Sequence, residues 1–499
     1  MKRPDVLMVV LDCVRRDVSD PDGSVAAHTP VLDGLRRDGT SFERAVATSH
    51  WTIPAHASLL TGTYPWEHRV FRGSTLSLPA TTVTIAEEFR RAGYRTGLFS
   101  SNPFLSPLTG LQRGFEVGAW GQFSDCFRRY QVSPRPAGRF GERLSPEGAA
   151  EWQDAGEPAY VRDTLRRLTT RFPLAAEILF EGARLRHGAS WAPHAPRVGG
   201  WIEPELRAWL ARVPSDEPVF CCINLLDAHE PYFGVMPFAR GRVREWLAAY
   251  SGPLDRTSWR RGDARPTAAD LRRIRSLYRA SIELIDHRLG GILEIVRGRA
   301  GGGRLATAVV ADHGQALGEE GLVYHVRGAA TSLLRVPMIL NDSTRTGPAR
   351  IDAWTSIKDT LPLMTEIDRD VGLAVPELAG RSPRESAEMG STGQVAALVD
   401  GPPADALPSG TTARTPQSDE HWVAVYGGDI KVQVNVGSGV AYLYPDVAGP
   451  NGHGRTPLPP DVAASPVARS ALAIRDTVRD ILSRGAWGLT GDRLRSWGY

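Results

Sequence analysis

The feature that most restricts the fold is a set of apolar runs that each end on polar residues. These runs are VLMVVLD ending at Asp12, RTGLFSSN ending at Asn102, VFCCINLLD ending at Asp227 and LATAVVAD ending at Asp312. Nearly continuous apolar runs of this length are typical of strands buried on both faces, as in a parallel sheet. Between them lie segments with a helical pattern, namely PVLDGLRRD from Pro30, TIAEEFRRA from Thr84 and a long stretch from Arg272 to Val296. Strands that alternate with helices indicate an α/β fold with crossover connections.

Polar residues at the ends of these strands predict a site at one edge of the sheet. In open α/β sheets ligands bind beyond the carboxyl ends of the strands. We therefore expect convergence of Asp12, Asn102, Asp227 with His229, and Asp312 with His313. Carboxylate oxygens and an adjacent imidazole are suitable ligands for a divalent cation. The sequence thus predicts metal ligands at Asp12, Asp312 and His313.

The stretch WTIPAHASLLTGTYP places a hydroxyl, that of Thr52, two residues before Pro54. A threonine at this position can cap a helix, because its side chain accepts a hydrogen bond from a free backbone N–H group. It can also be a nucleophile, because the exposed N–H groups and the positive end of the helix dipole attract an anion such as phosphate or sulfate. The local stretch alone favours the cap, and only a nearby metal or base favours chemistry.

Composition restricts the class of protein and its partners. The chain has 499 residues, 42% of them hydrophobic, with 59 basic and 56 acidic residues and a net charge of +3. This near balance predicts neither a nucleic-acid partner nor a membrane-surface partner. Neither a signal peptide nor an apolar stretch long enough to span a bilayer is predicted. The four cysteines form no CxxC pair, so we expect a soluble protein in a reducing cytoplasm.

The sequence predicts two domains of unequal size. We expect a large domain over residues 1–375, with a helical insertion over 122–198 that either roofs the site or is a surface excursion. We expect a smaller α/β domain over 376–499, where alternating runs predict antiparallel hairpins: HWVAVY from His421, IKVQVNV from Ile430 and VAYLY from Val440. The glycine-rich stretch from Gly298 to Arg304 precedes its strand and is interpreted as a plain turn.

Six ordered segments carry a resemblance that extends over nearly the whole chain apart from the 122–198 insertion. They are DVLMVVLDCVRRD from Asp5, TPVLDGLRRDGTSFERA from Thr29, TSHWTIPAHASLLTGTYPWEH from Thr48, DAHEPY from Asp227, ADHGQALGEEG from Ala311 and HVRGAATSLLRVP from His325. Together they resemble the sulfatase family of the alkaline phosphatase superfamily. The resemblance implies an alkaline-phosphatase-like α/β fold, with a large, mostly parallel sheet flanked by helices and a smaller C-terminal subdomain containing antiparallel strands.

The resemblance also implies roles for individual residues. Asp12, Asp312 and His313 would bind one Ca²⁺, Mg²⁺ or Mn²⁺, or take part in a two-zinc site as in phosphodiesterase relatives. Thr52 stands at the position of the family's nucleophile and would bridge metal and substrate.

Further positions of the same motifs suggest the groups around the substrate. His229 and His325 would flank the leaving group or the transferring anion, one of them as general acid, and His325 could instead be a ligand of a second metal. Substrate-binding positions would be His56, Asn102 and Arg327. His68 also matches the motif and is interpreted as structural.

Departures from the family pattern decide the expected chemistry. In the sulfatase signature, CxPxR or SxPxR, the cysteine or serine is oxidised to formylglycine. Thr52 cannot become that aldehyde, because its Cβ carries a methyl group. His56 replaces the arginine, Cys13 stands where many relatives have a second aspartate, and Ser101 or Asn102 stands in place of an expected lysine.

A threonine alkoxide that attacks a tetrahedral anion remains possible, and phosphorus both accepts and releases such a nucleophile. The predicted function is a metal-dependent hydrolase of small-molecule phosphate mono- or diesters, that is, a phosphatase or phosphodiesterase. Two alternatives stay open at this point. One is a sulfate-ester hydrolase that works without formylglycine, and the other is a catalytically inactive protein that keeps the fold and binds an anion.

Overall fold

The fold is seen in a computed structural model of the chain. It describes residues 3–120, 202–232, 266–342, 349–360, 394–400, 420–445 and 456–484, apart from short gaps at 21–22, 24, 103, 107–108, 231, 302, 320–321 and 326. The predicted insertion over 122–198 lies outside the described residues. Within the described residues, no helix combines the length and the apolar character needed to cross a bilayer.

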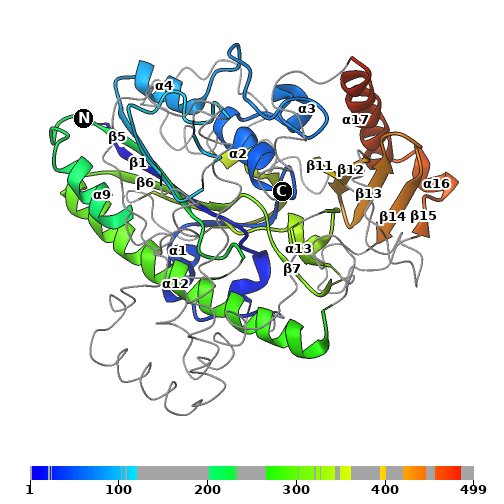
Figure 1. The fold of residues 1–499 in the computed structure, drawn as a ribbon, viewed down its shortest axis with the longest axis horizontal. Coiled ribbons are helices and arrows are strands. Elements are labelled where there is room, and N and C mark those ends of the chain that lie inside the picture. The colour runs from blue at the N-terminus through cyan, green and yellow to red at the C-terminus, as the bar shows by residue number, and fades with distance from the viewer. Residues whose placement is uncertain are drawn as a thin grey trace, which may run out of the picture.

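A large mixed sheet forms the centre of the molecule (Figure 1). Its strands, in spatial order, are β10 (Ala349–Ser356), β2 (Thr40–Val46), β9 (Met338–Asp342), β6 (Leu305–Ala311), β1 (Asp5–Leu11), β5 (Val219–Leu225), β3 (Arg95–Ser100) and β4 (Val117–Trp120). The five strands from β6 to β4 are parallel, whereas β9 is antiparallel to both of its neighbours. The four apolar runs became β1, β3, β5 and β6, so the predicted α/β fold with a mostly parallel sheet is confirmed.

The register of the central strands positions the site. Leu11 at the end of β1 lies opposite Leu225 of β5 on one side and Ala311 of β6 on the other. Since parallel strands end at the same edge of a sheet, the next residues, Asp12 and Asp312, emerge side by side.

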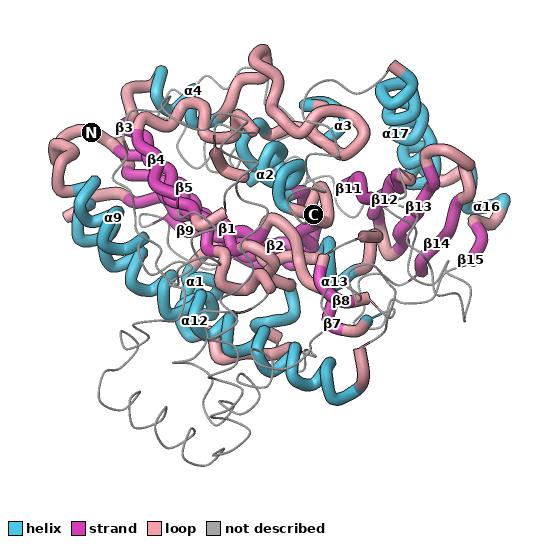
Figure 2. The backbone as a smooth tube through the Cα atoms, in the orientation of Figure 1, coloured by secondary structure: helices cyan, strands magenta, loops and turns pink. Residues whose placement is uncertain are grey.

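Helices cover both faces of the sheet (Figure 2). One face carries α1 (Pro30–Asp38), α9 (Ile202–Leu210) and α12 (Ala268–Ala300), and the other carries α2 (Thr52–Thr61), α3 (Pro65–His68) and α4 (Ile85–Arg91). Short elements near the site are η1 (Arg16–Ser19), β7 (Ala316–Leu317), β8 (Val323–Tyr324), α13 (Thr331–Leu334) and η5 (Ile357–Asp359).

Two local predictions are corrected by the helix boundaries. Thr52 is not the cap of α2: the N-cap is Trp51, and within the described helix no side chain caps it. The extended backbone of Trp51 (φ −149°, ψ 164°) makes the turn into the helix, so Thr52 is the first helical residue. The stretch from Gly298 is also not wholly a turn, because α12 continues to Ala300 and ends at Gly301 with φ +56°.

A second, antiparallel sheet lies beside the large one (Figure 1). It consists of β11 (Gln394–Asp400), β12 (His421–Gly427), β13 (Ile430–Asn435), β14 (Ala441–Pro445) and β15 (Thr456–Pro457), followed by α16 (Pro460–Ala463) and α17 (Pro466–Ser483). The predicted hairpins are thus confirmed. The boundary at 375/376 lies outside the described residues, and the two-domain division stays a prediction.

The second sheet has two buried faces, as its alternating sequence requires. Leu398 packs on the side of α17, whereas the next residue, Val399, belongs to the core of the large sheet. Backbone contacts fix this sheet to the main body: Leu398 N–H donates to Thr48 O (3.0 Å) and Gly328 N–H donates to Asp400 O (2.9 Å). The second sheet therefore supports segments on both sides of the predicted site.

Candidate active site

Two carboxylates form the centre of the site at the ends of β1 and β6. Asp12 and Asp312 are both 0% exposed. Oδ1 of Asp312 accepts hydrogen bonds from the backbone N–H groups of His313 (2.8 Å) and Cys13 (3.3 Å). Burial alone would raise the pKa of Asp312, but the neighbouring His313 and His56 outweigh it and lower that pKa. The Asp312 carboxylate is therefore held in its ionised form.

These residues fit a divalent cation. Oδ2 of Asp312 and Nε2 of His313 lie 3.4 Å apart. Nε2 of His313 has no hydrogen-bond partner among the described residues, and Oδ2 of Asp312 faces the His56 ring at 3.3 Å. Ligand atoms of Asp12, Cys13 and His313 lie within 4.8 Å of one another. Because buried polar atoms normally have partners, a buried imidazole nitrogen without a hydrogen bond, next to two buried carboxylates, indicates a missing positive charge. Carboxylate oxygens with one imidazole suit Mg²⁺, Mn²⁺, Ca²⁺ or Zn²⁺.

Thr52 stands next to this centre. It is buried, and Nδ2 of Asn102 approaches its Oγ1 at 3.5 Å. The same amide donates to Oδ2 of Asp12 at 3.0 Å, so Asn102 spans the hydroxyl and the carboxylate. Asn102 is itself fixed, because its Oδ1 accepts from Phe104 N–H at 3.0 Å. The hydroxyl therefore lies beside the carboxylates at the N-terminal end of α2, where the helix dipole favours negative charge.

His56 lies one helical turn beyond Thr52 and faces the metal ligands. Its Nδ1 is 3.1 Å from Thr52 O and 3.3 Å from Oδ2 of Asp312. Burial would lower its pKa, but the hydrogen bond to Asp312 and the negative charges of Asp312 and Asp12 outweigh it and raise that pKa. The predicted contact of His56 with substrate stays a prediction, since its observed contacts are with groups of the site itself.

Asn224 was not identified from the sequence. It is the second-last residue of β5, and its Nδ2 lies 3.4 Å from Oδ2 of Asp12 and 3.3 Å from Nε2 of His56. The signal that could have found it is a polar side chain inside the otherwise apolar run VFCCINLL. Asn224 therefore links Asp12 to His56 from the next strand.

A second group of side chains lies on the other side of Cys13. The rings of His229 and His325 are 4.7 Å apart, and Oε2 of Glu230 lies 3.7 Å and 3.5 Å from their Nδ1 atoms, respectively. Gln315 donates from Nε2 to Oε2 of Glu230 at 2.9 Å, and its Oε1 lies 3.0 Å from Nδ1 of His325. The structure thus brings together the two predicted histidines, whereas Glu230 and Gln315 were missed, although they lie within the DAHEPY and ADHGQ segments.

Two further predicted polar residues make no hydrogen bond with this group among the described residues. Asp227 does not join the other strand ends, because its Oδ1 pairs with Nε of Arg288 at 3.2 Å on α12. Arg327 is half-buried, and within the described residues no hydrogen bond is seen for it. Burial lowers the pKa of Arg327. Its role in substrate binding stays a prediction.

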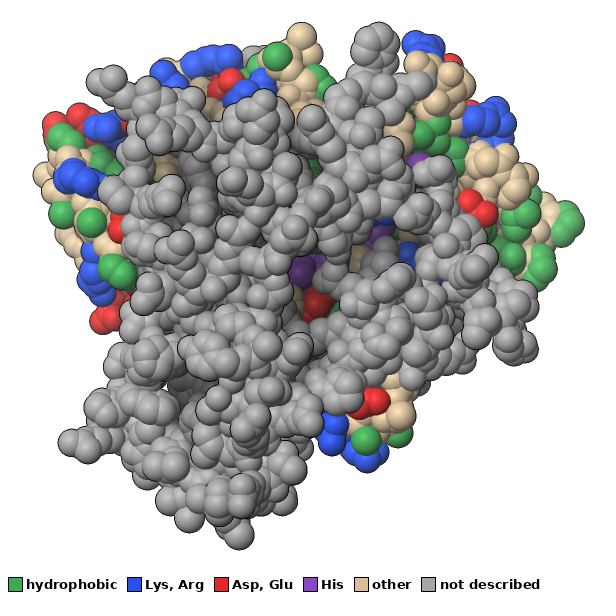
Figure 3. Space-filling view, viewed as in Figure 1, with side chains coloured by type: hydrophobic (Ala, Val, Ile, Leu, Met, Phe, Trp, Pro, Cys, Tyr) green, Lys and Arg blue, Asp and Glu red, His purple; other side chains and the backbone are tan. Residues whose placement is uncertain are grey.

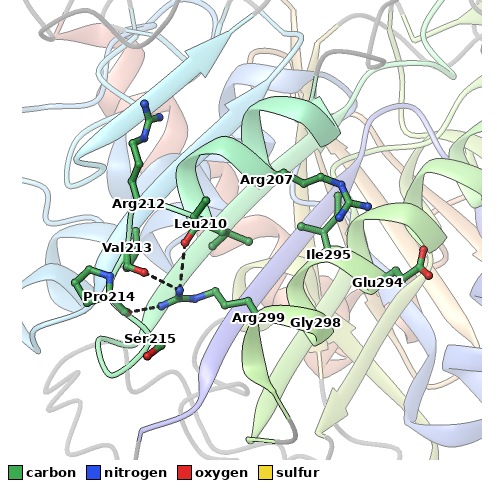
Figure 4. Close-up of a pocket in the computed structure, with 11 residues that line it drawn as sticks. Arg207, Leu210, Arg212, Val213, Pro214, Ser215, Glu294, Ile295, Gly298 and Arg299 are labelled. Carbon is green, nitrogen blue, oxygen red and sulfur yellow. Dashed lines mark hydrogen bonds between the residues drawn. The ribbon is translucent and has the colours of Figure 1, made fainter.

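Figure 3 shows histidine and acidic side chains near the centre of the visible face, between the large sheet and the second sheet. A separate pocket of about 710 Å³ lies between α9 and the end of α12 (Figure 4). There Arg299 donates to the backbone oxygens of Leu210 (3.4 Å), Val213 (3.1 Å) and Pro214 (3.0 Å). It also lies 3.6 Å from Asp5, the first residue of β1. This pocket is therefore at the opposite edge of the sheet from Asp12.

Comparison with known proteins finds similar sequences and similar folds. Residues 4–136 match the family described as Sulfatase. The multifunctional alkaline phosphatase superfamily protein PehA of Trinickia caryophylli is 24% identical over 362 residues, 69% of each chain. The N-acetylgalactosamine-6-O-sulfatase of Bacteroides thetaiotaomicron is 32% identical over 101 residues, 19% of this chain and 20% of that one. The phosphonate monoester hydrolase of Silicibacter pomeroyi has a similar fold, with a TM-score of 0.57, 16% identity, and coverage of 97% of this chain and 96% of that one.

Proposed function

We propose that this chain, whose residues 4–136 match the Sulfatase family, is an ester hydrolase of the alkaline phosphatase superfamily and that it cleaves phosphate mono- or diesters through Thr52. The observation that carries the proposal is the place of the Thr52 hydroxyl. It lies at the start of α2, within reach of Asn102 and beside the carboxylate of Asp12.

The side chain of Thr52 favours phosphorus over sulfur. A sulfatase that uses formylglycine expels sulfate by collapse of a hydrated aldehyde to a carbonyl, and threonine cannot form that aldehyde. A threonine ester of phosphate can instead be hydrolysed by attack of water at phosphorus.

Each residue of the site has a separate role in the proposed reaction. Thr52 gives its hydroxyl proton to solvent, and the Oγ alkoxide attacks phosphorus and forms the new P–O bond. The bond to the leaving group breaks, and the leaving oxygen takes a proton from His229 or His325. Asn102 orients the Thr52 hydroxyl, and the N-terminus of α2 stabilises the negative charge on the phosphoryl oxygens. Water then attacks phosphorus in line, gives a proton back to the same histidine and releases Thr52 as the alkoxide.

Asp12, Asp312 and His313 would hold the divalent metal ion that the family implies. When bound, this ion would lower the pKa of the Thr52 hydroxyl and neutralise charge on the phosphoryl group. His56 supports the ligand set from behind, since it contacts Asp312 and not the Thr52 side chain.

Removal of the nucleophile is the direct test. We expect Thr52→Ala to lower kcat for p-nitrophenyl phosphate or bis-p-nitrophenyl phosphate by at least about 1,000-fold, because no other hydroxyl takes its place. Thr61→Ala is the matched control, since Thr61 is a buried threonine at the far end of the same helix, bonded to Ala57 O. Its kcat should stay within a few-fold of wild type. Full activity in Thr52→Ala would exclude Thr52 as the nucleophile.

The substrate class is tested with a panel measured with and without Mn²⁺, Zn²⁺ or EDTA. It contains the two phosphate esters, a p-nitrophenyl phosphonate monoester and p-nitrophenyl sulfate. We expect metal-dependent turnover of the phosphorus esters and trapping of a phosphoryl group on Thr52 by acid quench and mass spectrometry. Release of sulfate without any phosphorus chemistry would replace the proposal by the sulfatase alternative, and no turnover of any ester would replace it by the anion-binding alternative.

A further inference from the structure

The turn after β1 has an unusual backbone conformation at Cys13. The φ angle of this residue is +63°, in the left-handed region that residues other than glycine rarely adopt. In this conformation Cys13 contacts both carboxylates of the candidate active site. Its backbone N–H donates to Oδ1 of Asp312 at 3.3 Å, and its thiol donates to Oδ1 of Asp12 at 3.2 Å. The arrangement of the two carboxylates therefore depends on a strained residue.

A tyrosine of the long helix α12 holds this turn. Tyr278 is 0% exposed, and its hydroxyl donates to the carbonyl oxygen of Cys13 at 2.8 Å. The same oxygen accepts from the backbone N–H of Arg15 at 3.0 Å. One hydroxyl thus uses both of its hydrogen-bonding roles on the two peptide groups that follow the left-handed residue. Since strained backbone persists only where the surrounding structure fixes it, we attribute the conformation of Cys13 to these two hydrogen bonds.

Tyr278 also contacts the neighbours of this turn. Its ring lies edge-on to that of Tyr232, with centroids 6.3 Å apart, and Tyr232 Oη accepts from Nε2 of Gln315 at 3.1 Å. The guanidinium group of Arg15 donates to the backbone oxygen of Gln315 at 3.3 Å. Tyr278 therefore lies where the loops after β1, β5 and β6 meet.

We propose that Tyr278 is a positioning residue of the metal site: its hydroxyl keeps the turn at Cys13 left-handed and so keeps the carboxylates of Asp12 and Asp312 ready for one cation. Without the hydroxyl, the peptide groups after Cys13 return to the right-handed or extended backbone that cysteine prefers, and the Cys13 N–H leaves Asp312. The value of this arrangement for catalysis rests on the proposed function, whereas the effect on cation binding does not.

The test is binding of Mn²⁺ or Zn²⁺ alone to the full chain after EDTA treatment, measured by isothermal titration calorimetry without substrate. Tyr278→Phe removes one oxygen from a buried ring. We expect it to weaken the Kd roughly 10- to 100-fold, as does the loss of an outer hydrogen bond that orients a metal ligand. Tyr94→Phe is the matched control, since Tyr94 is a buried tyrosine after α4 whose ring lies edge-on to Phe89. Its Kd should match that of wild type.

A glycine at position 13 separates this role from a general loss of stability. Glycine adopts left-handed backbone without strain, so the turn of a Cys13→Gly chain no longer needs the hydroxyl. In that background, whatever its own affinity, Tyr278→Phe should change the Kd by no more than about 2-fold, the usual scatter of additive substitutions. A loss as large as in the wild-type background would overturn the proposal, because the hydroxyl would then not act through Cys13.

Hydrogen exchange of the metal-free proteins gives a second readout. A peptide spanning residues 12–16 should exchange faster in Tyr278→Phe than in wild type, whereas peptides from β6 should not change. Unchanged exchange of the 12–16 peptide, an unchanged Kd in Tyr278→Phe, or a wild-type chain that binds neither ion would also overturn the proposal. Neither measurement uses an ester, so a failure of the proposed function would be seen separately, as absent turnover with cation binding still sensitive to Tyr278.

Discussion

At the scale of single residues, the chemistry of Thr52 depends on a shift of one position in the helix. A threonine at the N-cap would engage its hydroxyl with the first free N–H groups of α2. The structure gives that position to Trp51, and the Thr52 hydroxyl is left beside Asn102 and Asp12. The same side chain thus changes from a structural cap to a candidate nucleophile because the helix begins one residue earlier than a Thr52 cap would require.

His68 permits a test of burial on a titratable side chain. Its Nδ1 accepts from Val70 N–H at 3.0 Å, its Nε2 lies 3.1 Å from Ser58 Oγ, and burial lowers its pKa to about 3. In the unfolded chain the pKa of a histidine is about 6.5. Between these values the unfolded state binds more protons, so the free energy of unfolding must decrease as the pH falls, by up to about 1.4 kcal/mol per pH unit from this residue.

Urea unfolding of wild type and His68→Gln between pH 7 and pH 5 measures this contribution. The variant should be less stable at pH 7, because glutamine does not reproduce both ring contacts, but its stability should fall less steeply with pH. Equal slopes for the two proteins would show that His68 is not held neutral by burial.

The position of a residue along its strand decides whether the sequence could identify it as a site residue. Asp12, Asp312 and His313 follow the last apolar residue of a strand, and such positions meet at one edge of a parallel sheet. Asn224 lies inside β5 and looked like part of the core, whereas Glu230 follows His229 directly and carries no pattern of its own. Their roles come from contacts across strands, which a linear sequence does not contain.

At the scale of elements, the turn after β6 depends on α13. Gly314 N–H donates to Leu333 O (2.7 Å), and Gln315 N–H donates to Ser332 O (3.0 Å). A Cβ on Gly314 would clash with Ser332 O, which is a backbone atom and cannot rotate away. The close contact between these two segments therefore requires glycine and holds the neighbouring His313 in place.

We expect Gly314→Ala to destabilise the fold by about 1–3 kcal/mol and to weaken metal binding, because either the turn or α13 must move. Urea unfolding and metal titration measure the two effects. Gly298→Ala is the control, since a Cβ there meets no atom within 4 Å. Its stability should match or slightly exceed that of wild type, and an equal loss in both variants would contradict this explanation.

The burial of each strand explains which strands could be predicted from the sequence. β1, β3, β5 and β6 are apolar over most of their length because the sheet buries them on both faces. β2 (TSFERAV) and β10 (ARIDAWTS) carry polar residues and pair with each other near the edge of the sheet, so their sequences gave no comparable signal. The position of β9 between β2 and β6, antiparallel to both, could not be predicted, because the hydrophobic pattern of a strand does not determine its neighbours in the sheet.

At the scale of the whole molecule, the second sheet supports both halves of the site. Ser49, three residues before Thr52, donates from Oγ to Leu398 O of the second sheet at 2.9 Å. Lys431 of the same sheet donates from Nζ at 3.0 Å to the backbone oxygen of Ala329, which is four residues after His325. The sequence predicted the hairpins of this sheet but not this support, because it depends on long-range packing.

Cation binding should consequently be visible in the stability of the whole chain. The proposed ligands Asp12, Thr52 and Asp312 come from segments far apart in the sequence, so only the folded protein can bring them to one ion. An ion that binds only the folded state at 100 times its Kd stabilises it by about 2.7 kcal/mol. One kcal/mol shifts Tm by about 2–4 °C in domains of roughly 150–250 residues and by less in larger ones. We therefore expect Mn²⁺ or Zn²⁺ to raise the Tm of EDTA-stripped protein by a few degrees.

Asp312→Asn should gain little from Mn²⁺ at concentrations that saturate wild type, because the substitution removes a charged ligand from the centre of the site. Asp33→Asn is the matched control, since Asp33 is an exposed aspartate on α1, and it should gain as much as wild type. Differential scanning calorimetry over a series of metal concentrations gives both values. A rise in Tm that is the same in all three proteins would mean that the ion binds elsewhere, and it would remove the metal from the proposed reaction of Thr52.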